Sequence, residues 1–361
     1  MEETPPAITD QPGNVEKRGG LIYNRFVPTS ERQSPASPYQ EVVASFGPEL
    51  EAVEESILAH LESRNELLQN ITSYITGRGG KRLRPLLVLL CARLNGYEGP
   101  DHIILGNVVE YLHAATLLHD DVLDKAEIRR GSPSANQKWG NHFAVLGGDF
   151  LYTKAFEILL QRFPRDIIRI LCRASLDMIE GEVLQRQWKG RIDLSEETYF
   201  EIVSLKTASL ISACCQTGSL LGGAQLEQVE DLAEFGRLLG TAFQIIDDTL
   251  DYTADPENLG KALGGDLRQG TVTLPLIYLF QEKIPEEVRR KLAETIATGE
   301  IEEETVGRIT GLLVDHGCGR KAMDRAVSLA ETSKERLRSF TGSPLYPALT
   351  AAADFIIHRS H

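Results

Sequence analysis

The stretch ILGNVVEYLHAATLLHDDVLD, residues 104–124, is apolar around most of its helical circumference and ends in three aspartates. A helix that is apolar on every side belongs in the interior of a large helical bundle. Carboxylates at the end of such a helix repel one another, and burying them is costly unless a cation lies among them. The stretch therefore predicts an all-helical core and a cationic partner for the aspartates.

The helical period of apolar residues recurs along most of the 361-residue chain. Residues 50–75 repeat apolar side chains at intervals of three and four positions, as a helix does. Further stretches of this kind lie at 102–124, 143–160, 165–188, 196–222, 227–251, 272–281, 285–297, 302–315, 319–340 and 345–358. Proline and glycine separate them, and no convincing alternating strand pattern occurs. The sequence thus predicts an all-α fold.

The chain divides into a short arm and one large domain. Residues 1–40 are rich in Pro, Ser, Glu and Gly and have few periodic apolar positions. Such a segment cannot bury enough apolar surface to fold alone, so we expect a disordered or loosely docked arm. Residues 41–361 exceed the usual single-domain length, but large all-helical domains reach this size without splitting. We predict one domain over 41–361, which carries the function.

Composition excludes several classes of protein. A net charge of -14 argues against a nucleic-acid-binding surface. The first residues, MEETPPAITDQPG, carry acid and proline where a signal peptide needs basic and apolar residues. No apolar stretch approaches the roughly 20 residues of a membrane-spanning helix. The five cysteines lack C-x-x-C spacing and are expected to be small buried residues in a reducing compartment. These features predict a cytoplasmic protein.

Two clusters share the form D-D-x-x-D: Asp120, Asp121 and Asp124, then Asp247, Asp248 and Asp251. Asp120 and Asp124 lie one turn apart on one helix face, about 6 Å from each other, while Asp121 points to the side. One such cluster alone is commonly a solvated helix end. A second cluster inside FQIIDDTLDYT (243–253), another apolar helix, weakens that explanation, because facing carboxylates are hard to stabilise without metal.

The metal predicted for these clusters is Mg²⁺. Hard carboxylate oxygens suit Mg²⁺, which keeps several waters and is held by one or two carboxylates plus substrate phosphates. The lack of Cys or a suitably directed His beside the clusters disfavours zinc. His119 adjoins Asp120 but points to a different face, so we expect it to be structural. A di-iron bundle requires Glu-x-x-His motifs on facing helices, and none lines up here.

The segment TGRGGKRLRP, residues 76–85, combines glycines, basic side chains and the start of a helix. Glycine-flanked backbone amides, a helix N-terminus and Lys81 make a natural anion site. The segment is not a P-loop, because Lys81 is followed by Arg82 rather than by Ser or Thr. Taken alone, it also fits an ordinary basic surface turn.

His113 lies seven residues, or two helical turns, before Asp120 and faces the same side. A packed core histidine and a binding-site histidine both fit this position. Further donors for phosphate oxygens are Arg129, Arg130, Lys206, Thr207 and Lys261. Together with the acidic clusters, these residues describe a cavity for two diphosphates, one bound through metal and one directly through Arg and Lys.

Six segments occur in the order and spacing of one protein family: GGKRLRP, LLHDDVLDKAEIRRG, VLGGDFL, KTASL, FQIIDDTLDY and LGKALGGDLRQGTVTLP. On these segments the chain resembles the trans-polyprenyl diphosphate synthases, which are chain-elongating prenyltransferases, and among them the long-chain octaprenyl or solanesyl type. The similarity covers nearly everything from about residue 40 onward. It implies an all-helical isoprenoid-synthase fold around a deep central cavity, usually in a homodimer.

The resemblance also implies a role for each matching residue. Catalysis would depend on Asp120, Asp124, Lys206 and Asp247. Mg²⁺ ions would be held by Asp120, Asp124 and Asp247, with Asp121, Asp248 and Asp251 in support. The allylic diphosphate would contact Arg129, Lys206, Thr207, Gln244 and Lys261. Isopentenyl diphosphate would contact Gly80, Lys81, Arg84, His113 and Arg130. The family often has lysine where Thr271 stands, so a diphosphate contact from that loop stays open.

The implied reaction begins when Mg²⁺ and fixed cations stabilise the departing pyrophosphate, so that the allylic C–O bond ionises. The isopentenyl double bond attacks the allylic cation, and proton loss gives a chain longer by one isoprene unit. Ala115 and Thr116 stand one turn below Asp120, where short-chain members carry a bulky aromatic floor. We therefore expect a long product for a quinone side chain.

Two other interpretations are weighed against this one. A terpene cyclase of the same fold also uses an aspartate-rich motif and Mg²⁺, but it needs no isopentenyl site such as GGKRLRP suggests. A non-catalytic partner subunit would be expected to lose an acidic cluster, and here both are complete. The chain length, the allylic primer, handover of the product to the membrane and any need for an accessory subunit are left open.

Overall fold

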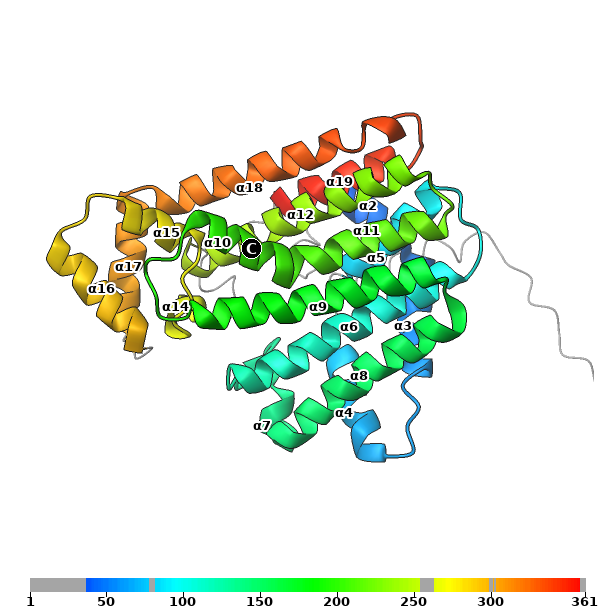
Figure 1. Cartoon of the computed structure of the whole chain (residues 1–361), viewed down its shortest axis with the longest axis horizontal. Helices are drawn as coiled ribbons and strands as arrows, with labels where there is room; N and C mark the ends of the chain where they lie inside the picture. The colour runs from blue at the N-terminus through cyan, green and yellow to red at the C-terminus, as the bar shows by residue number, and fades with distance from the viewer. Residues whose placement is uncertain (1–36, 78–81, 254–262, 299–300, 302, 358–361) are drawn as a thin grey trace, which may run out of the picture.

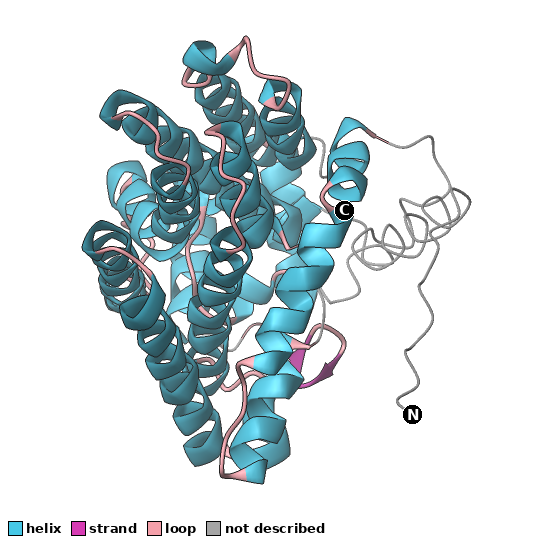
Figure 2. Ribbon diagram, turned by 90° about the vertical axis from the view of Figure 1, so that its right-hand side faces the viewer, coloured by secondary structure: helices cyan, strands magenta, loops and turns pink. Residues whose placement is uncertain are grey.

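The computed structural model describes residues 37–77, 82–253, 263–298, 301 and 303–357. Within these ranges nearly all regular structure is helical (Figure 1). A small antiparallel hairpin, β1 (Ile128–Arg129) and β2 (Ser132–Pro133), lies at one edge of the helical bundle (Figure 2). The prediction of an all-α fold is confirmed.

The helices follow the periodic stretches of the sequence closely. In chain order they are α2 (Pro38–Ser45), α3 (Gly47–Ala59), α4 (Glu66–Thr76), α5 (Leu83–Leu94), α6 (Asp101–Leu123), α7 (Ala135–Trp139), α8 (Asn141–Arg162), α9 (Arg165–Gln187), α10 (Glu196–Val203), η2 (Ser204–Ala208), α11 (Ser209–Leu221), α12 (Leu226–Thr253), α14 (Gly265–Arg268), α15 (Leu274–Gln281), α16 (Glu286–Thr298), α17 (Glu303–Asp315), α18 (Cys318–Glu335), η3 (Arg338–Phe340) and α19 (Tyr346–Ile357). η2 is a π-helical turn and η3 a 3₁₀ turn.

The prediction of one helix over 50–75 is wrong, because the chain leaves the helix between α3 and α4. α3 ends at Ala59, and α4 begins only at Glu66. Asn65 caps α4, since its side-chain oxygen accepts a hydrogen bond from the Leu68 backbone N–H at 3.2 Å. Leu61, in the connection, is fully buried. The apolar period therefore continues through a segment whose backbone is not helical.

The helices α5, α6, α11 and α12 form the centre of the bundle. All seven side chains of residues 86–92 in α5 are fully buried. α5 packs against α6 and α11, and α11 packs against α12. The approach of α5 to α11 is close, because a Cβ added at Gly218 would lie 2.6 Å from the Val88 carbonyl oxygen. The helices that carry the two acidic clusters, α6 and α12, thus belong to the core.

The described chain begins with a helix that packs on the last one. α2 docks against α19, where Tyr39 stacks on Phe355 with 3.8 Å between ring centroids. The helical body therefore includes Pro38 and Tyr39, just before the predicted boundary at residue 40. The predicted arm falls mainly on residues 1–36, which lie outside the described residues.

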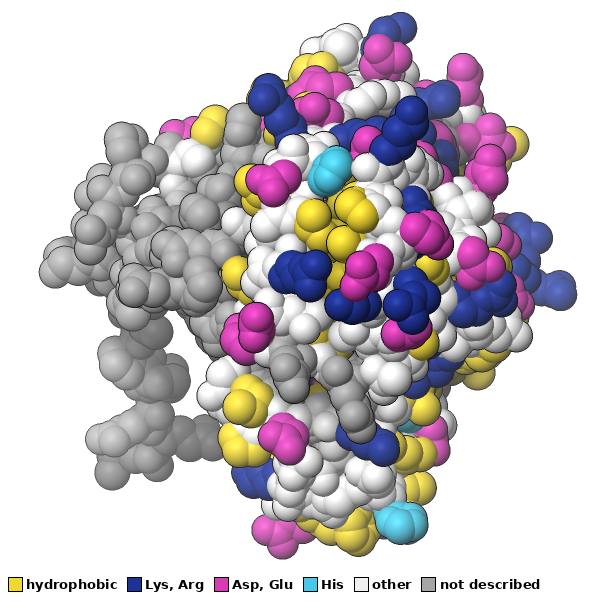
Figure 3. Space-filling model, turned by 90° about the vertical axis from the view of Figure 1, so that its left-hand side faces the viewer, with side chains coloured by type: hydrophobic (Ala, Val, Ile, Leu, Met, Phe, Trp, Pro, Cys, Tyr) yellow, Lys and Arg dark blue, Asp and Glu magenta, His cyan; other side chains and the backbone are white. Residues whose placement is uncertain are grey.

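One of the five cysteines is not buried, although the sequence predicts that all of them are. Cys172 is exposed on α9, whereas the other four cysteines are buried as expected, and all five are free thiols. The end of the molecule in Figure 3 mixes basic with acidic side chains. Across the described ranges, no helix combines the length and apolar character that a membrane crossing requires.

A buried ion triad around Arg82 joins four helices next to the cavities described below. The guanidinium bonds the carboxylates of Glu54 in α3 and Glu110 in α6, and it donates to the Thr76 carbonyl oxygen in α4 at 2.7 Å. Arg82 immediately precedes α5 and adopts a left-handed φ of 46°. Burial acts to lower the pKa of Arg82, but the Glu110 and Glu54 carboxylates outweigh it and raise the pKa. Arg82 is therefore a structural cation.

Replacing this cation is expected to leave two buried carboxylates without their partner. We expect Arg82→Met to lower the free energy of unfolding by about 3–5 kcal/mol, measured by urea denaturation. Arg162→Met is the matched control, because it removes an exposed ion pair, 3.1 Å from Asp101, and should cost at most about 1 kcal/mol. Equal losses in the two variants would contradict the structural role of Arg82.

Candidate active site

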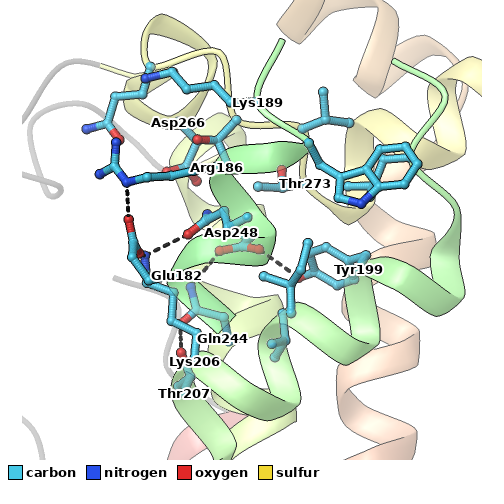
Figure 4. A pocket seen from close by; sticks show the side chains of 18 of the residues that line it. Glu182, Arg186, Lys189, Tyr199, Lys206, Thr207, Gln244, Asp248, Asp266 and Thr273 are labelled. Atoms are coloured by element: carbon cyan, nitrogen blue, oxygen red, sulfur yellow. Dashed lines mark hydrogen bonds and ion pairs between the residues drawn. The ribbon is translucent and has the colours of Figure 1, made fainter. Parts of the chain in front are cut away.

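Two neighbouring cavities lie between α6, α9, η2 and α12. Figure 4 shows side chains that line the first of them. The first, of about 210 Å³, is lined by Asp124 and Asp248, one residue from each acidic cluster. The second, of about 510 Å³, is lined by Asp120 and Asp247, again one from each cluster. Three polar residues line both cavities: Lys206, Thr207 and Gln244. The structure therefore brings the two clusters to one shared site.

Most of the predicted site residues line one or both of these cavities. They are Arg84, His113, Thr116, Asp120, Asp124, Arg129, Arg130, Lys206, Thr207, Gln244, Asp247 and Asp248. Thr271 lines the first cavity as well. Asp121, Asp251 and Ala115 are buried and line neither cavity. Gly80, Lys81 and Lys261 lie outside the described residues.

In the first cluster, Asp121 positions an arginine over the site. Its carboxylate is fully buried and accepts a hydrogen bond from Arg129 Nε at 2.5 Å. Arg129 belongs to the hairpin strand β1, so this ion pair ties the hairpin to the end of α6. Asp121 therefore acts on the second cavity through Arg129, which lines it.

In the second cluster, Asp248 is the centre of a buried hydrogen-bond chain. It accepts hydrogen bonds from the Tyr199 hydroxyl at 2.6 Å and from Gln244 Nε2 at 2.7 Å (Figure 4). Gln244 in turn accepts from the Thr207 hydroxyl at 2.8 Å. Burial raises the pKa of Asp248 to about 6, although both donors act to lower it. These hydrogen bonds hold the side chains of Thr207 and Gln244 in place, and both side chains line the two cavities.

Asp251 holds the segment that follows α12. It is buried, and its side chain accepts a hydrogen bond from the Asp266 backbone N–H at 2.9 Å. Its carbonyl oxygen accepts from Gly264 N–H at 2.8 Å. Asp251 thereby anchors the start of α14, and Asp266 lines the first cavity. Of the three aspartates in this cluster, Asp247 and Asp248 face the cavities.

Lys206 projects from the π-helical turn η2, between α10 and α11. Its ammonium contacts the Glu182 carboxylate and donates to Gln185 Oε1 at 2.6 Å. Burial acts to lower the pKa of Lys206, but the carboxylates of Asp120 and Glu182 outweigh it and raise the pKa. Lys206 is therefore a permanent cation between α6 and α9.

The close approach of α9 to η2 depends on a glycine. A Cβ at Gly181 would lie 2.6 Å from the Lys206 backbone nitrogen and 2.9 Å from the Leu205 Cβ. Backbone atoms cannot give way as the end of a flexible side chain can. Gly181 thus permits the contact that sets Lys206 beside Glu182.

One wall of the site, the C-terminal half of α9, is not predicted from the sequence. Glu182, Gln185 and Arg186 lie three and four residues apart in EGEVLQRQ (180–187), on one helix face. Arg186 Nη2 donates to Asp124 Oδ1 at 2.8 Å, and its Nε donates to Glu182 Oε1 at 2.6 Å. These three polar residues on one face were the available signal. α9 carries so many other charged residues that spacing alone does not single them out.

The carboxylates at the site fit a hard divalent cation. Burial raises the pKa of Asp120 to about 6; Lys206 opposes this shift, and Glu182 and Asp124 add to it. A nearby cation would favour the ionised carboxylate. In the part of the chain that the structure describes, no three His, Cys, Asp or Glu side chains already form a metal site. Carboxylate oxygens of this kind are the ligands that hard divalent cations prefer.

The two histidines near the first cluster differ in their surroundings. His113 lines the second cavity, where burial and the Arg84 and Arg130 guanidinium groups hold its pKa well below the ordinary value. It is therefore a neutral imidazole at pH 7. His119 instead approaches α8, with Nε2 at 3.2 Å from the Val145 carbonyl oxygen. His119 therefore lines neither of these two cavities, and its structural role stays a prediction.

A helical bundle that gathers two aspartate-rich helices around one site is the isoprenoid-synthase fold. The chain belongs to the polyprenyl synthetase family, whose model matches residues 65–313.

Its relatives include long-chain synthases. The octaprenyl diphosphate synthase of Escherichia coli (strain K12) is 42% identical over 241 residues, which are 67% of this chain and 75% of that protein. The octaprenyl diphosphate synthase of Haemophilus influenzae is 35% identical over 321 residues, 89% of this chain and 97% of that one. A crystal structure of polyprenyl synthase from Caulobacter crescentus CB15, complexed with calcium and isoprenyl diphosphate, matches with a TM-score of 0.86 at 34% identity, covering 91% of this chain and 100% of that chain.

The contact at Gly181 can be tested by adding one methyl group. We expect Gly181→Ala to lower the free energy of unfolding by about 1–3 kcal/mol, because η2 has to move away from α9. The matched control is Gly311→Ala in α17, where an added Cβ meets no atom within 4 Å. There alanine should be neutral or stabilise by up to about 1 kcal/mol. Chemical denaturation measures both, and equal values would rule out the tight contact.

Proposed function

We propose that this chain condenses isopentenyl diphosphate with an allylic diphosphate to make a long all-trans polyprenyl diphosphate. The observation that carries the proposal is the shared site, where Asp120 and Asp247 line one cavity and Asp124 and Asp248 the next. Relatives named octaprenyl diphosphate synthase, at 35% and 42% identity, support the long product. Such a product suits a quinone side chain and would be handed to the membrane.

The allylic half of the site is built on the two acidic clusters. Asp120, Asp124 and Asp247 would hold Mg²⁺, supported by Asp121, Asp248 and Asp251 through the contacts described above. Bound Mg²⁺ supplies charge neutralisation for the pyrophosphate as it leaves. The fixed Lys206 ammonium adds a donor that needs no reorganisation when the allylic C–O bond ionises. Calcium and an isoprenyl diphosphate are present in the relative from Caulobacter crescentus.

The isopentenyl half of the site is the basic part of the second cavity. Arg84 and Arg130 line it and would bind isopentenyl diphosphate directly. His113, as a neutral imidazole, can donate one hydrogen bond there without adding a third positive charge. Binding the acceptor here holds its double bond near the allylic carbon, and that proximity lowers the barrier to condensation. No protein nucleophile is required.

A third cavity fits the growing hydrocarbon chain. It has about 510 Å³, and the residues that line it include Thr116, Asp120, Tyr152 of α8 and Met178 of α9. Thr116 lines the second cavity as well. Ala115 is fully buried within the packing of α6. Of the two residues expected to set product length, Thr116 is therefore the one in a position to meet the chain.

A second copy of the chain is the proposed partner. α8 and α9 carry exposed apolar side chains, which are Phe143, Val145, Leu146, Leu160, Leu176, Ile179 and Val183. Of these, Val145, Ile179 and Val183 also line the third cavity, so the proposed interface would border it. Contiguous exposed apolar surface commonly marks a protein interface. We therefore propose a homodimer formed through α8 and α9.

The activity is tested with purified chain, labelled isopentenyl diphosphate, farnesyl diphosphate and Mg²⁺. We expect long polyprenyl diphosphates, and we expect Asp120→Asn/Asp247→Asn to lose about a thousand-fold of the rate or more. Asp193→Asn, in an exposed ion pair with Arg191, is the matched control and should keep full activity. Light scattering of the same sample should give twice the 40.0 kDa chain mass.

Each interpretation predicts a different result in this assay. Cyclised hydrocarbon without incorporated isopentenyl units would indicate a terpene cyclase. No product from the chain alone, but product after a second subunit is added, would establish the accessory subunit. Activity that survives in the double variant would contradict the metal assignment.

Product length is tested at Thr116. We expect Thr116→Phe to shorten the main product by several isoprene units, because the ring would narrow the start of the second and third cavities. Thr116→Val keeps the size of the side chain and is the control, which should leave the product unchanged. Thin-layer or mass analysis of the dephosphorylated products measures this, and an unchanged length in Thr116→Phe would exclude a floor at this level.

A further inference from the structure

Arg186 forms an ion pair with Asp124, the last aspartate of the first cluster. Its guanidinium donates to Asp124 Oδ1 at 2.8 Å and to Glu182 Oε1 at 2.6 Å, and a third nitrogen lies 3.5 Å from the Leu123 carbonyl oxygen. The side chain is 31% exposed, so it can leave these partners without unfolding α9. Arg186 also lines the first cavity beside Lys206.

Arg186 belongs to a cluster of interacting charges and not to an isolated surface ion pair. Its guanidinium bridges two carboxylates, those of Asp124 at 2.8 Å and Glu182 at 2.6 Å. Lys206 and Arg186 are the cations that contact Glu182. With Arg186 on Asp124, a divalent cation that approaches this carboxylate meets a positive charge already there.

From this geometry we infer that Arg186 is an exchangeable counter-ion: it pairs with Asp124 when that carboxylate binds no metal ion, and it becomes a ligand of the diphosphate when Asp124 binds one. The inference rests on the proposed function, which supplies the diphosphate. It gives Arg186 two effects of opposite sign. Arg186 weakens the binding of Mg²⁺ alone, and it strengthens the binding of diphosphate together with Mg²⁺. Metal binding thereby becomes dependent on substrate.

The test measures binding without turnover. Calorimetry is run with Mg²⁺ alone and then with inorganic pyrophosphate at saturating Mg²⁺, on wild type, Arg186→Leu and Arg186→Gln. We expect both variants to bind Mg²⁺ alone several-fold more tightly than wild type. We expect both to bind pyrophosphate about ten-fold more weakly, because one charge-assisted hydrogen bond to phosphate is lost.

A nearby arginine provides the matched control. Arg191→Leu removes a guanidinium that pairs with Asp193 at 2.8 Å, packs over Trp188 and lines neither of the first two cavities. It should bind both ligands as wild type does. Melting curves establish that every variant is folded, and Arg186→Gln keeps an amide donor for Asp124 in case the leucine variant is unstable.

Three outcomes decide the matter. Tighter Mg²⁺ binding together with weaker pyrophosphate binding in the Arg186 variants supports the inference. Unchanged pyrophosphate affinity in both variants overturns it, whatever Mg²⁺ alone does, while the proposed function stands because wild type still binds. If wild type and Arg191→Leu themselves fail to bind pyrophosphate with Mg²⁺, the proposed function falls, and the inference falls with it.

Discussion

The placement of carboxylates inside an apolar helical bundle is the constraint on which the rest of this structure depends. Desolvation favours the neutral form of these groups, and like charges near one another add to the cost. Asp120 and Asp248 accordingly have pKa values raised to about 6. The bundle tolerates such groups only because donors and cations are built around them. Much of the polar structure near the site serves that purpose.

The groups that offset the cost of burial differ from one aspartate to the next, and these differences indicate different roles for the aspartates. Asp121 is paired with Arg129, and the Asp251 carboxylate accepts a hydrogen bond from the Asp266 backbone N–H, so both hold neighbouring structure in place. Asp248 shares its two oxygens between Tyr199 and Gln244. Asp124 is paired with Arg186, which is partly exposed, so this ion pair is weaker and easier to break. A site that must take up metal ions and release pyrophosphate needs this last kind of partner.

Helix packing supplies the cations at the distances that the carboxylates require. Arg82 draws α3, α4 and α6 to the start of α5, beside the basic half of the second cavity. Gly181 lets α9 approach the π-helical turn that carries Lys206. π-helical turns are rare and are frequent at functional sites, because the extra residue redirects a side chain that a regular helix would place elsewhere. Packing energy from the apolar core thus holds the charged groups in positions that they would not adopt alone.

The sequence by itself determined the helical architecture and both acidic clusters, because apolar period and D-D-x-x-D spacing are local properties that can be read without a structure. Most of the site residues that it predicted line the cavities, but many other residues that line them were not predicted. The sequence did not reveal the break between α3 and α4, where Leu61 continues the apolar period through a non-helical segment. It also did not separate Arg82, a buried structural cation, from the basic residues beside it in GGKRLRP. Only the tertiary structure decided that Glu182, Gln185 and Arg186 form a wall of the site and that Thr116, but not Ala115, lines the cavities. These assignments depend on which face of a helix meets which neighbour, and that is set by contacts between residues far apart in the chain.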